Sequence, residues 1–291
     1  MVDIDKLIAK PGKKIILKNH DTKYTGHYKE KDAKKKLKKN KKELDKLQYT
    51  FYADNTHSLL IVLQAMDAAG KDGAIRHVMS GVNPQGCTVH NFKAPNKNEL
   101  EHDFLWRHYI RLPERGQIGI FNRSHYENVL VTKVHPEFIL NEQLPGINSV
   151  DDIDEQFWAN RYEQIRNFEK TVYQNGTIIL KFFLHLSKEE QKQRFLDRIN
   201  ETDKNWKFSS NDIKERQYWN DYQNAFEQAI NETSTDYAPW YIIPADNKWF
   251  SRIAISDIII HTLESLDMKI PELAPDEKAK LEDAKQALLN E

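Results

Sequence analysis

The sequence of 291 residues predicts an α/β protein in which a parallel sheet is sandwiched between helices. Three observations support this fold class. Short apolar runs alternate with longer amphipathic segments along the chain. The first of these runs, SLLIVLQAM, leads into a loop that ends in Gly70-Lys71 and is followed by a helical pattern. No internal repeat and no low-complexity linker divides the chain into two halves.

Composition excludes several classes of protein. The hydrophobic content of 39% supports a sizeable core, and the longest apolar runs have the length of strands rather than of membrane-spanning helices. The single cysteine, Cys87, excludes an internal disulfide framework and fits a reducing compartment, so we expect a cytoplasmic protein without a membrane partner. No CxxC or HExxH zinc spacing occurs. The net charge of -1 argues against a globally basic nucleic-acid binder.

Residues 1–55 are expected to form a basic helical extension at the N-terminus. Within it, residues 29–46 carry ten lysines and four acidic residues. This charge is typical of a solvated helix face, and it also fits a basic arm that attracts a polyanion. Aromatic residues do not alternate with the lysines, so no nucleic-acid partner is indicated.

Residues 56–270 are expected to form the main domain. Five short apolar runs bounded by polar or turn residues predict strands, at 59–65, 87–92, 116–121, 177–186 and 240–244. Apolar residues at helical spacing predict helices, at 71–80, 97–111, 154–174, 188–200, 211–231 and 247–267. The segment 271–291 is predicted to be a charged C-terminal helix that packs on the surface or on a partner subunit.

The segment LQAMDAAGKDGAIRHVM, residues 63–79, carries the first candidate site. In a P-loop, G-x-x-x-x-G-K-[ST], backbone amides cradle phosphate, the lysine reaches phosphate oxygens and the hydroxyl ligates magnesium. Here Ala65 stands at the first glycine position and Asp72 replaces the hydroxyl. A Gly-Lys turn opening an ordinary helix is the alternative. The strand-loop-helix context favours an anion-binding nest, formed by Ala68, Ala69, Gly70, Lys71, Asp72 and Gly73.

Carboxylates beside this nest indicate a metal. Asp67 and Asp72 would repel phosphate unless a cation compensates, and hard oxygen ligands suit magnesium. A second buried run ends in the polar stretch that contains Asn122, Arg123 and Glu127. If the two strands are neighbours, these residues lie beside the first loop, because ligands bind at the carboxyl ends of parallel strands. The alternative is a turn followed by a helix cap.

A lid is predicted over about 194–216, around the polar segment 200–212. Basic residues surround this segment, at Arg194, Arg198, Lys204 and Lys207. A loop of this kind closes over phosphates and excludes water in phosphoryl transfer. The alternative is an ordinary solvated basic loop.

Four separated motifs, MDAAGKDG, SGVNPQG, FNRSHYENVLV and STDYAPWYIIPADNKWFSR, together resemble the type-2 polyphosphate kinase family over about residues 10–265. The resemblance implies a thymidylate-kinase-like P-loop fold with a lid. It also implies direct phosphoryl transfer between inorganic polyphosphate and nucleotides with Mg²⁺. The family pattern G-x-D-x-x-G-K is matched at Asp67, Gly70 and Lys71, and Ala65 departs from it.

The polar residues after the 116–121 run resemble one subgroup of that family. Many members have Asp-Arg-Ser-Trp-Tyr-Asn where this chain has Asn-Arg-Ser-His-Tyr-Glu over 122–127. The arrangement of Asn122 and Glu127 is similar to class III, whose members phosphorylate both AMP and ADP. AMP, ADP and ATP are therefore the expected nucleotide partners.

The resemblance, together with the chemistry of phosphoryl transfer, implies a role for each residue. Asp67 and Glu127 would hold Mg²⁺, while Lys71 and Arg123 offset charge on the transferring group. Arg198, Lys204 and Lys207 would close over the substrate. A homo-oligomer, either a dimer or a tetramer, is expected. An ATP-dependent nucleotide or nucleoside kinase of the same fold and a catalytically silent polyanion-binding module remain open alternatives.

Overall fold

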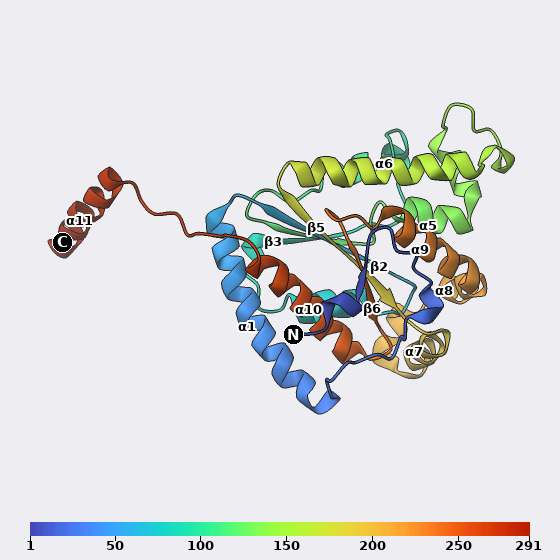
Figure 1. The fold of residues 1–291 in the computed structure, drawn as a ribbon, viewed down its shortest axis with the longest axis horizontal. Helices are drawn as coiled ribbons and strands as arrows, with labels where there is room; N and C mark the ends of the chain where they lie inside the picture. The colour runs from blue at the N-terminus through green and yellow to red at the C-terminus, as the bar shows by residue number, and fades with distance from the viewer.

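The computed structural model has a six-stranded sheet at its centre, between two layers of helices (Figure 1). It describes the side chains of residues 1–203, 205–206 and 208–291. The strands are β1 (Ile8–Ala9), β2 (Ser58–Ala65), β3 (Cys87–Asn91), β4 (Ile118–Asn122), β5 (Thr177–His185) and β6 (Trp240–Pro244). They lie in the order β1-β6-β5-β2-β4-β3, and β1 alone is antiparallel to its neighbour. The predicted α/β fold with a parallel sheet is confirmed.

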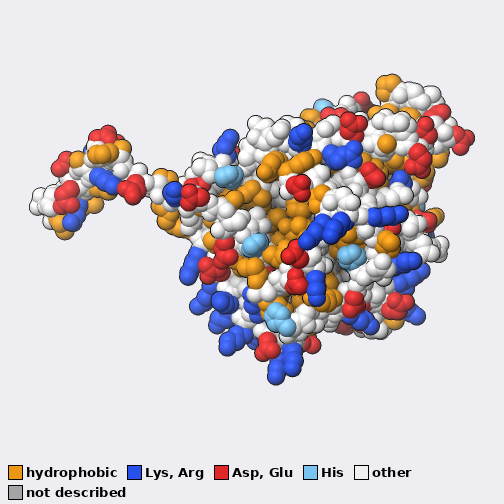
Figure 2. Space-filling model, viewed as in Figure 1, with side chains coloured by type: hydrophobic (Ala, Val, Ile, Leu, Met, Phe, Trp, Pro, Cys, Tyr) orange, Lys and Arg blue, Asp and Glu red, His pale blue; other side chains and the backbone are white. Residues whose placement is uncertain are grey.

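Helices cover both faces of the sheet. One layer contains α1 (Glu30–Asp54), α2 (Lys71–Val78) and α10 (Lys248–Glu264). The other contains α5 (Glu127–Val134), α6 (Glu155–Gln174) and α9 (Trp219–Thr233). The remaining helices are α3 (Lys97–Leu100), α4 (Trp106–Tyr109), α7 (Lys188–Asn200), α8 (Ser210–Glu215) and α11 (Pro275–Leu289). Lys and Arg side chains gather along the border of the molecule where α1 runs (Figure 2).

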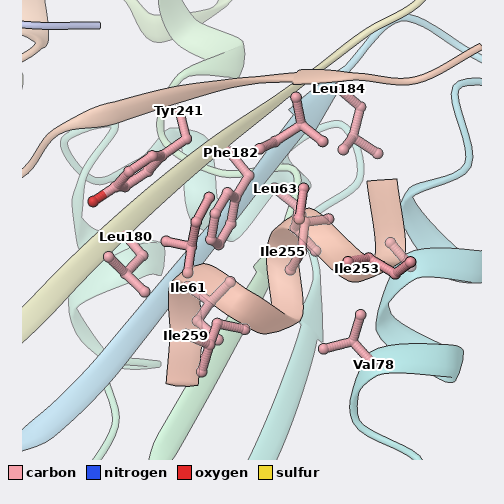
Figure 3. Close-up of a cluster of buried hydrophobic side chains, with 14 of the residues drawn as sticks. Ile61, Leu63, Val78, Leu180, Phe182, Leu184, Tyr241, Ile253, Ile255 and Ile259 are labelled. Carbon is pink, nitrogen blue, oxygen red and sulfur yellow. The ribbon is translucent and has the colours of Figure 1, made fainter. Parts of the chain in front are cut away.

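The core follows from the alternation of side chains along the central strands, which are apolar on both faces. Ile61 and Leu63 of β2 point toward α1, α2 and α10, while Leu60 and Val62 point toward α5, α6 and α9. Figure 3 shows the first of these clusters, in which Ile259 of α10 lies against the side chains of the strands. β2 lies in the middle of the sheet, between β5 and β4, and helices bury it on both faces.

The order of the strands fixes the position of the candidate site. From β2 the chain crosses to β3 on one side of the sheet, and β5 and β6 lie on the other side. Open α/β sheets bind ligands at such a point, outside the carboxyl ends of the strands. Leu63 of β2 pairs with Asn122 of β4, and the amide of Arg123 donates to the carbonyl of Leu63 at 3.1 Å. The two polar segments are thus neighbours, as the sequence analysis required.

The structure differs from the sequence prediction over 97–111, where one helix was expected and two short ones are found. A capping box between Asn96 and Glu99 starts α3, which ends after one turn. The Asp103 carboxylate then accepts the amide of Leu105 at 2.9 Å, and this local turn interrupts the helical hydrogen bonds. The predicted helix over 211–231 is likewise divided, into α8 and α9. The strand β1 was not predicted.

The first 55 residues lie against the same layer as α10. β1 pairs with β6, and α1 runs along α10 (Figure 1). Asp257 of α10 is 1% exposed, and it accepts hydrogen bonds from the amide of Val2, the side-chain amide of Asn40 and the ammonium of Lys36 at 2.7–2.8 Å. One buried carboxylate therefore joins the N-terminus, α1 and α10. Treating these 55 residues as a separate extension remains a prediction.

The C-terminal helix α11 projects away from the rest of the protein (Figure 1). Leu281 and Leu288 of this helix are exposed. In the part of the chain that the structure describes, no helix is both long and apolar enough to cross a membrane.

We expect Asp257→Ala to lower the free energy of unfolding by about 2–3 kcal/mol, because three donors lose a buried charged acceptor. Urea unfolding followed by circular dichroism measures this change. The matched control is Asp267→Ala, which removes a carboxylate that is 89% exposed and should change stability by less than about 0.5 kcal/mol. Equal costs for the two substitutions would contradict the role given to Asp257.

Candidate active site

A cavity of about 990 Å³ opens at the carboxyl ends of the central strands. Its wall comes from the Gly70 loop (residues 66–70) with the start of α2, from the residues that follow β4, and from the helices α7 and α8. The predicted site residues that line this cavity are Asp67, Ala68, Ala69, Gly70, Lys71, Asp72, Gly73, Asn122, Arg123 and Arg198. The structure thus brings most of the predicted residues into one space.

The Gly70 loop has the backbone of an anion-binding nest. Ala68 and Gly70 have φ of +62° and +107°, and α2 begins directly at Lys71 without a side-chain cap. The first amides of α2 therefore lie at the cavity wall without intrahelical acceptors, at the positive end of the helix dipole. Ala65 is accommodated because it is the last residue of β2, outside the two positions with positive φ.

Lys71 bends back over the loop that precedes it. Its ammonium donates to the carbonyl of Ala65 at 2.9 Å. Removal from water lowers the pKa of Lys71 and Arg123 lowers it further, while Asp67, Glu127 and Asp72 act in the opposite direction. The ammonium is thus placed among three carboxylates and a guanidinium, where an added phosphate would meet two positive groups.

Arg123 connects the Gly70 loop to the residues after β4. Its backbone has a φ of +61°, which is uncommon for a residue with a side chain, and its guanidinium lies 3.2 Å from Oδ1 of Asp67. Burial opposes the charge on the guanidinium, but Glu127 and Asp67 outweigh it and raise the pKa of Arg123. The positive charge is therefore permanent at the junction of the two segments.

Asn122 holds Asp72 in a fixed position. The side-chain amide of Asn122 is buried, and it donates to Oδ1 of Asp72 at 2.7 Å and to Oδ1 of Asn91 at 2.6 Å. Asp72, which occupies the position of the P-loop hydroxyl, is thereby turned toward β4. Of the two carboxylates beside the nest, Asp67 is the one that contacts the Arg123 guanidinium.

Glu127, the first residue of α5, lines a second cavity of about 330 Å³. Burial raises the pKa of Glu127, while Arg123 and Lys71 oppose that shift. Phe92, Lys93 and Arg123 line both cavities, so the two spaces adjoin. Aromatic side chains from three segments contribute to the smaller one, namely Phe92, Phe104 and Phe138.

The residues between Arg123 and Glu127 are anchored in the core. Ser124 accepts a hydrogen bond from the buried amide of Gln64 on β2 at 3.1 Å. The hydroxyl of Tyr126 donates to Glu169 of α6 at 2.8 Å and lies 2.9 Å from the hydroxyl of Thr233 on α9. The segment is thus tied to a strand and to two helices, so the uncommon backbone of Arg123 is held from three sides.

A buried ion pair lies beneath this segment. The ammonium of Lys181 on β5 is 2.6 Å from Glu169 and 2.9 Å from the hydroxyl of Tyr126, and Lys181 and Glu169 are fully buried. Burial lowers the pKa of Lys181 to about 8, although Glu169 acts in the opposite direction. His125 adds a contact of 3.3 Å to the same carboxylate. Sequence analysis overlooked this pair, although a lysine in the middle of an apolar run is a visible signal.

Arg194 has a different role from the one suggested by its place in the lid. It is 4% exposed, and its guanidinium donates to the carbonyls of Ala68 and Ala69 at 3.0 and 2.8 Å and to that of Ala245 at 2.6 Å. Gln191, one turn earlier on α7, donates to the carbonyl of Asp67 at 2.9 Å. These two side chains of α7 therefore hold the Gly70 loop in shape.

An ion pair of the lid lies close to the cavity. Arg198 of α7 lies 3.3 Å from Asp212 of α8, and both line the larger cavity. Burial and the charge of Asp67 raise the pKa of Asp212, while Arg198 lowers it. Lys204 and Lys207, the other two predicted lid cations, lie outside the described residues. Closure of the lid over a substrate remains a prediction.

Sequence analysis also overlooked the far wall of the larger cavity. Arg252 of α10 lines this wall next to Gly73, and Lys248 of the same helix lines it as well. Burial lowers the pKa of Arg252, and the positive charges of Arg76 and Arg194 lower it further. Several like charges therefore gather on one wall, an arrangement that favours an anion in the cavity.

The carboxylates fit the way magnesium binds to phosphate enzymes. Among the described residues, no group of three or more His, Cys, Asp or Glu side chains is placed to hold a metal ion. Mg²⁺ bound with phosphate substrates requires fewer protein ligands, since one or two carboxylates suffice when phosphate oxygens and water complete its shell. Asp67 lines the larger cavity and Glu127 the smaller one, and their joint role as metal ligands remains a prediction.

Comparison with known proteins finds relatives along most of the chain. The family profile described as polyphosphate kinase 2 matches residues 27–271. The chain is 50% identical over 279 residues to ADP-polyphosphate phosphotransferase of Rhodopseudomonas palustris, with 96% of each chain covered. It is 47% identical over 231 residues to AMP/ADP-polyphosphate phosphotransferase of Meiothermus ruber, with 79% of this chain and 81% of the relative covered. The crystal structure of polyphosphate kinase 2 from Arthrobacter aurescens matches with a TM-score of 0.85 at 35% identity, and the match covers 95% of each chain.

We expect Glu169→Gln to destabilise the protein by about 3–5 kcal/mol, because it leaves the ammonium of Lys181 buried without its counter-charge. Thermal and urea unfolding measure this loss. Glu163→Gln makes the same chemical change at an exposed position of the same helix and should be nearly neutral. A cost for Glu169→Gln no larger than that for Glu163→Gln would show that the pair does not hold the segment.

Proposed function

The chain belongs to the polyphosphate kinase 2 family, and we propose that its two adjoining cavities bring polyphosphate and a nucleotide together around Arg123. It is a polyphosphate kinase, an enzyme that transfers a phosphoryl group between polyphosphate and a nucleotide. The position of Arg123 is the observation that supports this proposed site most directly. This residue lines both cavities, contacts Asp67 and has a backbone held by the core.

The larger cavity is the proposed polyphosphate side. Helix-terminal amides of α2, the ammonium of Lys71 and the guanidinium of Arg252 all lie along it. These donors offset the charge that develops on the transferring group and its leaving oxygen. No strong base is required, because the attacking oxygen of a nucleotide phosphate is already anionic. Arg198 and the lid would exclude water from the transfer.

The smaller cavity is the proposed nucleotide side. Its aromatic side chains suit a base, and Glu127 and Arg123 lie at its border with the phosphate cavity. The relative from R. palustris is named for ADP, and the one from M. ruber for AMP and ADP. The arrangement of Asn122 and Glu127 favours the acceptor range in the name of the M. ruber relative, so AMP and ADP are both proposed acceptors. ATP is then a product, and a donor in the reverse direction.

Magnesium is the proposed cofactor. Bound at this site, it would neutralise negative charge on the reacting phosphates. Asp67 and Glu127 would hold it, and Asn122 keeps Asp72 oriented beside them. The cytoplasm is the proposed location, since the one cysteine, Cys87, is free and fits a reducing compartment.

A donor screen tests the proposed function against the alternatives. The protein is incubated with Mg²⁺, AMP and either polyphosphate or ATP, and nucleotides are resolved by chromatography. We expect ADP and then ATP to form from polyphosphate. Transfer from ATP alone would favour an ATP-dependent kinase, and no transfer from either donor would favour a silent polyanion-binding module. Use of ADP without any use of AMP would overturn only the proposed acceptor range.

Lys71→Ala should lower the rate of transfer on the order of 10²-fold or more, because a charge contact prepared for the transferring phosphate is lost. The fold should remain, since Lys71 lies at the wall of a cavity rather than in the apolar core. Steady-state kinetics and circular dichroism give the two readouts. Lys170→Ala, at an exposed position of α6, is the matched control and should retain the parent rate. Unchanged turnover of Lys71→Ala would remove Lys71 from the site.

Charge reversal on α1 tests whether its lysine face guides a polymeric substrate. Four exposed lysines are changed to Glu, at Lys35, Lys38, Lys39 and Lys42. A remote basic surface raises the association rate of a long polyanion without entering the chemistry, so the Michaelis constant for long polyphosphate should rise while the maximal rate is kept. Short chains should respond much less.

Salt provides the control for this experiment. Exposed charges more than ~8–10 Å apart are largely screened near physiological ionic strength, so added salt should reduce the difference between variant and parent. Reversal of three exposed lysines on α11, Lys278, Lys280 and Lys285, should leave the Michaelis constant unchanged. Equal kinetics of the α1 variant and the parent on long chains at low salt would return α1 to a solvated helix.

A further inference from the structure

The last residue of α8, Glu215, joins the lid to two helices outside it. Nε2 of His135, at the C-terminal end of α5, lies 2.9 Å from Oε2 of Glu215. The hydroxyl of Tyr222 on α9 donates to the same oxygen at 2.7 Å. An ionised carboxylate only accepts hydrogen bonds, so Nε2 of His135 carries the hydrogen in this contact.

His135 also supports the wall of the smaller cavity. The rings of His135 and Phe138 lie 5.5 Å apart between their centroids, and the carbonyl of His135 accepts the amide of Phe138 at 3.1 Å. Phe138 lines the smaller cavity and is 47% exposed, so a ligand in that cavity can cover it. Asn141 and Glu142, which belong to the same 3-10 helix, line the cavity as well. A ligand that packs on Phe138 therefore acts on the residue that contacts the lid.

Tyr222 places this contact near the charges of the active site. Burial raises the pKa of Tyr222, its hydrogen bond to Glu215 raises it further, and the negative charges of Glu127 and Asp67 act in the same direction. The hydroxyl therefore keeps its proton and donates to Glu215 at neutral pH. The contact between the lid and the two helices thus lies beside the carboxylates that surround Arg123.

Arg216, the residue after Glu215, fastens the end of the lid from another side. Its guanidinium donates to the carbonyl of Lys188 and to Oε1 of Gln191 on α7, both at 2.8 Å. Gln191 in turn donates to the carbonyl of Asp67 at 2.9 Å. Loss of the contact at Glu215 should therefore leave the lid attached through Arg216, and the protein should remain folded.

We infer that His135 and Glu215 form a latch by which a nucleotide in the smaller cavity holds the lid over the larger cavity. One turn before Glu215, α8 carries Asp212, which lines the larger cavity. A nucleotide packed on Phe138 fixes the ring of His135, and this ring fixes α8 through Glu215. Both latch residues are positioning residues, because they act through Phe138 and α8. The inference rests on the proposed function, which assigns the smaller cavity to the nucleotide.

The latch determines what happens to polyphosphate when no acceptor is bound. In transfer to water, the terminal phosphoanhydride bond breaks and the water oxygen bonds to phosphorus. A proton goes to solvent, and orthophosphate leaves a chain that is one unit shorter. A lid that is held by the acceptor excludes water only when transfer to the acceptor can occur. The latch thus protects the donor from being wasted on water.

The kinetics of His135→Ala test the latch. Because a hydrogen bond to a charged group is lost, KM for AMP and for ADP should rise about tenfold. The ratio of orthophosphate released to nucleotide phosphorylated should rise as well, which a purely structural role would not cause. Glu215→Ala cuts the latch from the other side and should give the same changes, and the double variant should be no worse than either single one. A parent-like ratio in both single variants would overturn the inference.

Two conservative variants and one control locate the effect at Nε2. His135→Gln places a side-chain amide near the position of Nε2 and should restore most of both values. His135→Asn reaches only the position of Nδ1 and should behave like His135→Ala. Glu137→Ala removes an exposed carboxylate that lies 3.5 Å from Nδ1, and it should keep the parent values. Equal effects of Glu137→Ala and His135→Ala would contradict the latch.

Limited proteolysis with trypsin follows the lid without any transfer. AMP should slow cleavage within residues 198–214 of the parent and should leave cleavage of His135→Ala unchanged, as located by mass spectrometry. Equal protection of the two proteins would contradict the latch, and so would a parent that transfers from polyphosphate but whose lid AMP does not protect. Protection of the parent alone, in a protein that transfers nothing from polyphosphate, would support the latch and remove only the proposed donor.

Discussion

The pairing of β2 with β4 is the constraint on which the rest of the site depends. These strands lie side by side in the middle of the sheet, and the amide of Arg123 continues their ladder by donating to the carbonyl of Leu63. Because both strands are parallel, the Gly70 loop and the segment that begins with Arg123 leave the sheet at the same level. A phosphate nest, a permanent cation and two carboxylates therefore meet in one place. A shift of this register would separate Asp67 from Arg123.

Buried charges keep both halves of the site in place. The guanidinium of Arg194 donates to carbonyls of the Gly70 loop. Glu169 and Lys181 form hydrogen bonds with Tyr126, which anchors the segment that begins with Arg123. Such groups cost free energy to bury, and they persist because each is saturated with hydrogen bonds. Phosphoryl transfer depends on positioned charge more than on a reactive side chain, so a rigid frame serves the reaction directly.

Much of the fold and of the candidate site could be predicted from short stretches of the sequence. The Gly70 loop was predictable because its residues are contiguous and its strand and helix are strongly patterned, and the fold followed from apolar runs of strand length. The division of the 97–111 helix depended on the capping box at Asn96, whose signal is only a few residues long. The role of Arg194 was not predictable, because its acceptors on the Gly70 loop are more than a hundred residues away. β1 was not predictable either, because it has two residues and is a strand only by its pairing with β6.

A double-mutant cycle between Asp67 and Arg123 tests the central claim, that the two segments act as one charged unit. The values of kcat/KM are measured for the parent, Asp67→Asn, Arg123→Gln and the double variant, with polyphosphate as donor. If the two residues act together, the loss in the double variant is smaller than the sum of the single losses by about 1–2 kcal/mol. Losses that simply add would show that the contact between Asp67 and Arg123 has no part in the transfer, and would contradict the account.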